Sequence, residues 1–134
     1  MPRLNFTWWN LQNFFDTDDD PISHDFAYTP EEGWTTEAFE AKKANLAAIL
    51  RDTHGDEAPD LVAVCEIEKD ELLAELLQEA GLNELRVAFD DSGTSDLRGI
   101  DVAVAYNPNK LELVTKQSHV VHLRYRTRDI FELV

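Results

Sequence analysis

The stretch PDLVAVCEIE, residues 59–68, holds the clearest strand pattern in the chain. Pro59-Asp60 forms a turn-prone pair, and Leu61 to Cys65 is apolar at every position. A strand that is apolar on both sides is typical of the centre of a sheet covered on both faces. Glu66 follows directly, where burial of a carboxylate is costly unless it meets a cation or hydrogen-bond donors. The stretch therefore predicts a central strand with an acid at its carboxyl end.

A second strand is predicted near the N-terminus. Residues 4–10 alternate, with Leu4, Phe6, Trp8 and Asn10 on one face and Asn5, Thr7 and Trp9 on the other. Counted by twos, Glu66 shares a face with Val62 and Val64 of its own strand. Ligands of open α/β sheets gather at the carboxyl ends of strands. We therefore expect the amide of Asn10 and the carboxylate of Glu66 to converge.

The remaining pattern predicts two helices and a strand-rich second half. Apolar residues at helical spacing predict a helix from Thr35 or Thr36 to just before Gly55, and a second that begins near Leu72 and ends at Gly81. Period-two patterns predict strands at residues 85–89, 100–106, 111–116, 119–124 and 129–134. Two βα units followed by strands favour an α/β or α+β layered sandwich. The last predicted strand runs into the chain end without a turn, which we interpret as a truncated domain.

The charge balance excludes one class of function. The 134 residues include 27 Asp and Glu against 12 Lys and Arg, for a net charge of -15. A protein that coats nucleic acid non-specifically needs a basic surface to displace counterions from phosphates. Chemistry on a phosphate stays compatible with this composition, because a bound divalent cation reverses the local field.

The sequence also carries expectations about location. Met1-Pro2-Arg3 leads straight into the first alternation without a signal peptide, and no apolar run has transmembrane length. The single cysteine, Cys65, allows no internal disulfide and favours a reducing compartment. We expect a cytoplasmic monomer without a membrane segment, or a secreted protein if a longer parent chain carries a signal.

The pair of Asn10 and Glu66 suits Mg²⁺. That ion keeps most of its waters and takes its other oxygens from one or two carboxylates and from substrate phosphate. It would stabilise charge on the phosphate and position an attacking water, while Asn10 hydrogen-bonds the phosphate or that water. The alternative is that Glu66 starts a solvated loop and Asn10 caps a turn. Position alone leaves both interpretations open.

Four motifs taken together resemble a known family. They are, in chain order, WWNLQNFFDTDDDP, PDLVAVCEIEKDELL, DLRGIDVAVAYNPNKLEL and RTRDIF. The ordered set resembles the endonuclease/exonuclease/phosphatase superfamily, which has the deoxyribonuclease-I-like fold. The resemblance implies part of a four-layer α/β/β/α sandwich with mixed, largely antiparallel sheets, residues 1–134 being the N-terminal part of one domain.

The resemblance implies a hydrolase that acts on phosphate ester bonds, most closely a nuclease-like phosphodiesterase. Its cofactor would be Mg²⁺, with Mn²⁺ or Ca²⁺ as alternatives. Its substrate would be a phosphate ester, and nucleic acids, inositol phosphates and phospholipids all remain candidates. The site residues follow motif by motif. Asn10 matches the asparagine that ends the family's first strand, and Glu66 matches its metal-binding glutamate. Cys65 stands where the family often has glutamine.

The third motif resembles the family's "RG-D-A-Y-P" strand pair, so Arg98 and Asp101 would border the site. Asn13 and Arg128 are further candidates for cleft or phosphate contacts. The family's later groups are a histidine after the "RDI" strand, an Asp-x-Asn pair and an Asp-His pair, and none of them has a match here. A general base alone contributes about 10²–10⁴-fold to a rate. We therefore expect these residues alone to be inactive or nearly so.

Two other functions compete with this one. The first is a non-catalytic interaction module on the same fold. The second is an acidic calcium-binding domain built on Asp16, Asp18 and Asp20, which have EF-hand spacing. Pro21 takes the place of the required glycine and Ala27 that of the bidentate glutamate, so a solvated acidic loop is favoured.

The remaining candidates are basic or nucleophilic. Arg124, Arg126 and Arg128 alternate, so a strand would place them on one face, to contact phosphate or to balance carboxylates. Arg128 is the strongest phosphate candidate of the three. Cys65 lies in an apolar run without a partner base, which favours a structural role. The histidines lack metal-ligand spacing and none is predicted to be catalytic: His24, His54, His119 and His122.

Overall fold

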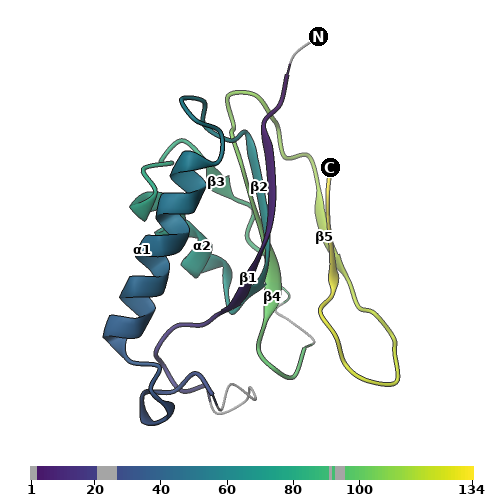
Figure 1. Ribbon diagram of the computed structural model, residues 1–134. Coiled ribbons are helices and arrows are strands. Elements are labelled where there is room, and N and C mark those ends of the chain that lie inside the picture. Colours follow the sequence, from purple (N-terminus) through teal and green to yellow (C-terminus); the bar gives the residue numbers. More distant parts are fainter. Residues whose placement is uncertain (1–2, 21–26, 91, 93–95) are drawn as a thin grey trace.

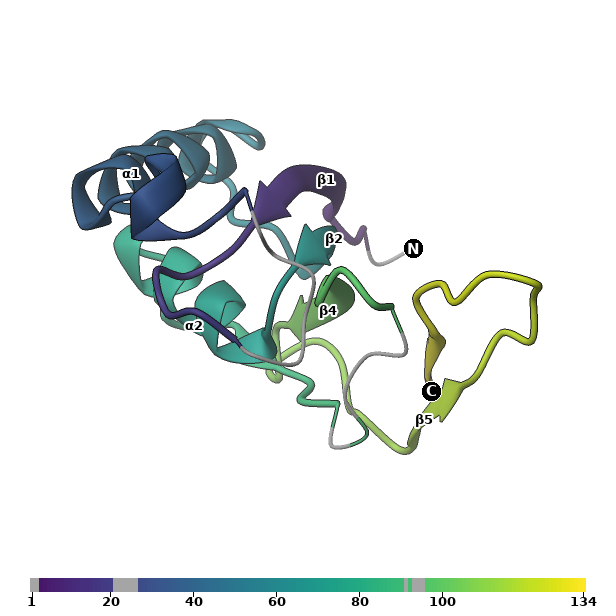
Figure 2. The same ribbon diagram turned by 90° about the horizontal axis from the view of Figure 1, so that it is seen from below.

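The computed structural model describes residues 3–20, 27–90, 92 and 96–134, so His24 and two residues of the turn at 91–93 lie outside it. Three layers are stacked side by side in Figures 1 and 2. Helices α1 (Thr36–Asp52) and α2 (Asp70–Glu79) form the first, a four-stranded sheet the second and a two-stranded sheet the third. This mixed α/β architecture confirms the predicted fold class. In the described ranges, no helix combines the length and apolar character needed to span a bilayer.

The larger sheet has the order β1-β2-β4-β3. Its strands are β1 (Phe6–Phe14), β2 (Leu61–Ile67), β4 (Asp101–Tyr106) and β3 (Arg86–Val87). β1 runs parallel to β2, and β4 runs antiparallel to both β2 and β3. β2 is an interior strand, as its unbroken apolar run predicts. The carboxyl ends of β1 and β2 and the start of β4 therefore meet at one end of the sheet, called the site end below.

The core lies between the helices and the larger sheet. Thr35 caps α1, accepting a hydrogen bond on its hydroxyl from the Ala38 N–H at 3.3 Å, as the sequence predicts. A short 3₁₀ helix, Pro30–Glu32, precedes it. The ring of Phe14 stacks on Phe39 of α1 with 5.4 Å between centroids. The largest group of buried core side chains comes from α2 and β2: Leu72, Leu73, Leu76, Leu77, Val62, Val64 and Ile67.

β1 continues four residues beyond the predicted end at Asn10. Gln12 and Asn13 adopt left-handed backbone, with φ of 54° and 60°, and the pairing with β2 resumes at Phe14. The irregularity lets both Leu11 and Phe14 reach the core, where they are 1% and 0% exposed. Leu11 and Phe14 are three residues apart, so they do not fit the alternation of a regular strand. The strand predicted from that alternation therefore ended at Asn10, four residues before the end of β1.

The C-terminal strands differ most from the prediction. Strands predicted at residues 111–116 and 119–124 are wrong, because a single short strand, β5 (Lys116–His119), spans the boundary between them. It pairs antiparallel with β6 (Ile130–Leu133), which confirms a strand within residues 129–134. Residues 120–129 belong to no strand. The sequence alternates in this segment, but the segment has no neighbouring strand to pair with in the described structure. A lone extended segment does not form a sheet.

We predict that Phe14→Ala lowers the free energy of unfolding by about 3–5 kcal/mol, because it leaves a cavity against Phe39. Phe6→Ala is the matched control. Phe6 lies on the same strand but is 54% exposed, and its loss should cost about 1 kcal/mol or less. Urea unfolding followed by tryptophan fluorescence measures both. Equal losses in the two variants would contradict the assignment of Phe14 to the core.

Candidate active site

Residues from three strands meet at the site end of the sheet. In the parallel pairing of β1 with β2, Asn10 lies opposite Cys65, the residue before Glu66. In the antiparallel pairing of β2 with β4, Asp101 lies opposite Ile67, the residue after Glu66. The register thus places the backbone of Asn10 and of Asp101 on either side of Glu66.

Glu66 is an extra residue in β2. Cys65 pairs with Val102 and Ile67 pairs with Asp101, so Glu66 has no partner residue in β4, and its φ is 59°. An insertion of this kind bends the strand and re-aims a side chain. Left-handed backbone at a residue other than glycine is strained and often marks a functional position. Within the described ranges, the non-glycine residues with positive φ are Gln12, Asn13 and Glu66, all at the site end.

The bulge corrects one prediction about Glu66. Val62 and Val64 are buried in the core beneath the helices, at 0% and 1% exposure. The side chain of Glu66 instead keeps 19% exposure and lies beside Arg128. The prediction that Glu66 shares a face with Val62 and Val64 is therefore wrong. The extra residue breaks the alternation on which that prediction rested.

Arg128 places a cation next to this carboxylate. Its Nη1 lies 3.8 Å from Glu66 Oε1, which makes an ion pair but is too long for a hydrogen bond. Nη1 is buried and has no hydrogen-bond acceptor in the part of the chain that the structure describes. A buried donor without an acceptor costs about 1–3 kcal/mol. The guanidinium is thus positioned to donate to a further anionic oxygen beside Glu66.

Lys42 of α1 supports the irregular end of β1. Its Nζ donates hydrogen bonds to the carbonyl oxygens of Gln12 at 2.6 Å and of Asn13 at 3.0 Å. Burial lowers the pKa of Lys42, and the negative charge of Glu66 acts in the opposite direction. Sequence reasoning missed this lysine. Its position between Phe39 and Leu46, on the apolar side of the predicted helix, was the available signal.

Asn10 holds its own turn. Its Oδ1 accepts a hydrogen bond from the Gln12 N–H at 2.8 Å, the capping contact that the alternative interpretation expected. A side-chain amide carries two N–H donors besides this acceptor. The amide oxygen keeps a second lone pair, so this geometry leaves both predicted roles of Asn10 open, as a metal ligand and as a donor to phosphate or water.

Arg98 and Cys65 complete the surroundings of Glu66. Arg98 donates to both carboxylate oxygens of Asp96, from Nε at 3.0 Å and from Nη2 at 2.7 Å. This pairing raises the pKa of Arg98, and the charge of Glu66 adds to the effect. Burial raises the pKa of the Cys65 thiol, and the neighbouring Arg128 opposes that rise. Both arginines therefore lie within electrostatic reach of the candidate metal ligand, while the thiol is not activated.

Asp101 is a partly buried carboxyl at the start of β4. Its Oδ1 accepts a hydrogen bond from the Val102 N–H at 2.8 Å. Burial raises its pKa to about 6, and the nearby carboxylates of Asp90, Asp70 and Asp129 add to the rise. Asp101 thus borders the site end, as the family resemblance implies, with a proton affinity above that of an ordinary aspartate.

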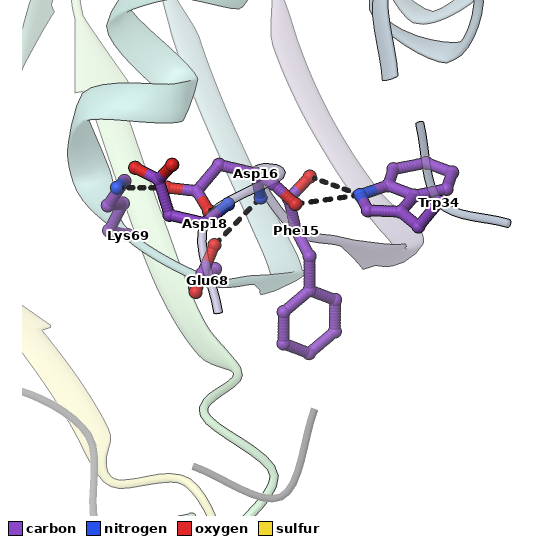
Figure 3. Close-up of polar contacts among 6 residues, drawn as sticks. All are labelled: Phe15, Asp16, Asp18, Trp34, Glu68 and Lys69. Carbon is purple, nitrogen blue, oxygen red and sulfur yellow. Dashed lines mark hydrogen bonds and ion pairs between the residues drawn. The ribbon is translucent and has the colours of Figure 1, made fainter. Parts of the chain in front are cut away.

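The acidic loop after β1 is held by protein groups (Figure 3). The Asp16 N–H donates to Glu68 Oε2 at 2.8 Å, and the Asp16 carboxylate pairs with Lys69. The indole N–H of Trp34 donates to the Asp16 carbonyl oxygen at 2.7 Å. The Asp18 N–H donates to Asp16 Oδ1 at 2.8 Å. The first aspartate of the calcium hypothesis is therefore engaged by a lysine and by the loop's own backbone.

The donor set at the site end fits Mg²⁺. No group of three or more His, Cys, Asp and Glu side chains that could hold a metal occurs in the described ranges. A Ca²⁺ site needs six to eight oxygens, whereas Mg²⁺ takes one or two carboxylates and completes its shell with water and phosphate. Glu66 alone meets the smaller demand.

The histidines that the structure describes are occupied elsewhere or exposed. His54 Nε2 is hydrogen-bonded to the Thr7 hydroxyl at 2.8 Å, and His119 Nε2 pairs with Glu132 at 2.6 Å. His122 is exposed in the segment after β5.

We predict a pH-dependent stability effect for Asp101→Asn. Because the folded-state pKa is raised, the stabilising contribution of Asp101 is complete below its ordinary value of 3.8 and is lost as the pH rises through about 6. The asparagine variant should therefore match the wild type near pH 4 and exceed it near pH 7, by on the order of 1–3 kcal/mol. Urea unfolding at both pH values measures the difference.

Asp56→Asn removes one carboxylate at an exposed position and controls for the reduced net charge. The burial account of Asp101 is contradicted if the two variants show the same change in stability between pH 4 and pH 7.

The sequence model of a protein family, described as the Endonuclease/Exonuclease/phosphatase family, matches residues 5–134. No curated protein and no solved structure matches the chain. The family match spans every strand and helix described above, including the bulged end of β2 and the segment that carries Arg128. It confirms the resemblance that the four motifs indicated. The chain belongs to the Endonuclease/Exonuclease/phosphatase family.

Proposed function

We propose that this chain contributes the metal-binding part of an active site that hydrolyses phosphate esters, with phosphodiesters as the first candidates. Family membership supports phosphate-ester hydrolysis in general terms. One observation carries the assignment to this end of the sheet: the buried Nη1 of Arg128, without an acceptor, lies 3.8 Å from Glu66 Oε1. A guanidinium and a carboxylate this close, yet not hydrogen-bonded to each other, could each bind a different part of one metal–phosphate group.

The charges divide the work between the residues. Arg128 donates to one phosphate oxygen, and the amide N–H groups of Asn10 donate to another or to the attacking water. Glu66 would repel phosphate unless a cation lies between them, so its part is to hold that cation. When bound, Mg²⁺ would polarise the phosphate and lower the pKa of a coordinated water.

Arg98 and Asp101 are proposed to act from the border of the site. Arg98 is committed to Asp96, and its charge adds to the positive field around Glu66. Asp101 changes protonation near pH 6, so substrate affinity that depends on its charge would vary in that range. Asn13 acts through its backbone, because its carbonyl oxygen binds Lys42 and fixes the end of β1.

The family's later catalytic groups, a histidine, an Asp-x-Asn pair and an Asp-His pair, have no match in residues 1–134. They would clamp the phosphate and supply the general base, which is worth about 10²–10⁴-fold in rate. The residues described here are therefore proposed to bind metal and phosphate without efficient turnover. The calcium-binding alternative loses support, because Asp16 already pairs with Lys69.

We predict that Glu66→Gln weakens Mg²⁺ binding by about tenfold or more. Removal of a residue that only contacts a metal ligand typically lowers metal affinity or activity by about 10–100-fold, and Glu66 would be a direct ligand. Isothermal titration of the 134-residue chain with Mg²⁺ measures the loss. Glu84→Gln, which removes an exposed carboxylate from the segment before β3, should bind Mg²⁺ as the wild type does.

Arg128→Lys separates the phosphate from the metal. It keeps the positive charge but removes the planar donor, so inorganic phosphate should bind several-fold more weakly in the presence of Mg²⁺ while Mg²⁺ binding is retained. If Glu66→Gln and Glu84→Gln bind Mg²⁺ equally, the proposed site is wrong. If Arg128→Lys changes neither affinity, Arg128 has no place in it.

A further inference from the structure

One segment of this acidic chain carries basic residues without acidic ones. Residues 113–128 contain four Lys and Arg and no Asp or Glu, although acidic residues outnumber basic ones 27 to 12 in the whole chain. Most of the segment forms the connection between β5 and β6, residues 120–129, called the connecting loop below. Its charge is opposite to that of the rest of the molecule, so it is a local surface for an anionic partner.

The arginines of the connecting loop are not engaged in balancing carboxylates. Arg124 and Arg126 are exposed, and neither forms a hydrogen bond or an ion pair with any residue in the described ranges. The contact that Arg124 does make is with the ring of Tyr125, whose centroid lies 5.6 Å from its Cζ. The sequence left two roles open for these arginines, phosphate contact and the balancing of carboxylates. The described contacts give no support to the second role at Arg124 and Arg126.

An aromatic ring is presented to solvent between these two cations. Tyr125 is 74% exposed and the nearby Leu123 is 68% exposed. Exposed tyrosines flanked by arginines are the elements with which proteins bind single-stranded nucleic acid, because the ring stacks on a base and the guanidinium groups contact phosphates. Stacking tolerates any base, so such a surface would have little sequence preference.

The connecting loop lies on the approach to the candidate active site. Arg128, at its C-terminal end, is the residue that contacts Glu66. Figure 1 shows the loop extending from the same end of the molecule at which β1 and β2 finish, and Figure 2 shows it standing clear of the larger sheet. A chain of phosphates that passes Arg124 and Arg126 can therefore continue towards Arg128.

We propose that the connecting loop docks a single-stranded nucleic acid, with Tyr125 stacking on a base and Arg124 and Arg126 contacting phosphates. The direction towards Glu66 rests on the proposed function, whereas the docking itself does not. A duplex fits less well, because its bases are already stacked and its second strand adds negative charge, which the net charge of -15 repels. A single strand needs only the narrow basic footprint that the loop provides.

An anionic bilayer is the other partner that arginine and exposed apolar side chains attract. A bilayer is a broad, flat, negative surface, and it would bring the carboxylates on neighbouring parts of this chain close to its headgroups. The net charge of -15 therefore favours the narrow partner over the broad one. Vesicles of phosphatidylserine provide the comparison.

The test is binding of a fluorescent oligothymidine of about 12 nucleotides, a length within the range of known single-strand sites. The 134-residue chain is titrated in low salt with EDTA, and anisotropy reports binding. Tyr125→Ala should weaken binding by about fivefold or more, and Tyr125→Phe, which keeps the stacking ring, should bind as the wild type does. Circular dichroism should show an unchanged fold, since the side chain is 74% exposed.

The double variant Arg124→Ala/Arg126→Ala should bind more weakly. The negative slope of log K against log salt should decrease in magnitude by about 1.4, the value for two phosphate contacts on a single strand. Arg86→Ala is the matched control. Arg86 is an exposed arginine on β3, opposite Tyr106 in the register, at the other end of β4 from Asp101. Its loss should change neither the affinity nor the slope.

Three results would overturn the assignment: no binding of the oligonucleotide, equal binding by the wild type and the Tyr125→Ala variant, or vesicle binding without oligonucleotide binding. Tyr125→Ala distinguishes this proposal from the proposed function. It should weaken oligonucleotide binding in EDTA and bind Mg²⁺ as the wild type does, because Tyr125 lies outside the proposed metal site. A failure of Glu66→Gln to affect Mg²⁺ binding would contradict the metal site and leave the docking loop standing.

Discussion

The left-handed backbone of Glu66, with φ of 59°, is the constraint on which the site end of the sheet depends. In a regular strand, Glu66 would point with Val62 and Val64 into the apolar core, where an unpaired carboxylate is costly. The extra residue turns it towards Arg128 instead. Strain at such a position costs about 1–3 kcal/mol and persists only when surrounding structure fixes it. The surrounding structure here is the buried β2 and the irregular end of β1 braced by Lys42.

Local electrostatics explains how an acidic chain could bind phosphate. Its overall charge of -15 repels polyanions, so contact has to be local. Two local devices are present at the same end of the molecule. One is the pair of Glu66 and Arg128, to which we assign a metal and a phosphate in the proposed function. The other is the connecting loop, where Arg124 and Arg126 have no carboxylate partner in the described ranges.

Much of the fold could be predicted from the sequence, because β2, α1 and α2 carry patterns that their own surroundings impose. The unbroken apolar run at Leu61–Cys65 requires cover on both faces, and the Thr35 cap marks the start of α1. The continuation of β1 to Phe14 could not be predicted, since its two left-handed residues depend on Lys42, a tertiary contact. The strands predicted at residues 111–116 and 119–124 were misplaced, because alternation indicates extended backbone but not a pairing partner. Strand order correctly predicted that β1 and β2 are neighbours, which places Asn10 opposite Cys65, but the direction of the Glu66 side chain depends on the bulge.

We propose that Glu66 holds a cation and that Arg128 binds a phosphate oxygen beside it. A crystal structure of the chain grown with Mg²⁺ and inorganic phosphate tests this most directly. The account predicts a magnesium ion coordinated by a carboxylate oxygen of Glu66, and a phosphate oxygen within hydrogen-bond distance of Arg128 Nη1. Direct hydrogen bonding between Arg128 and Glu66, with magnesium and phosphate bound elsewhere or not at all, would contradict it.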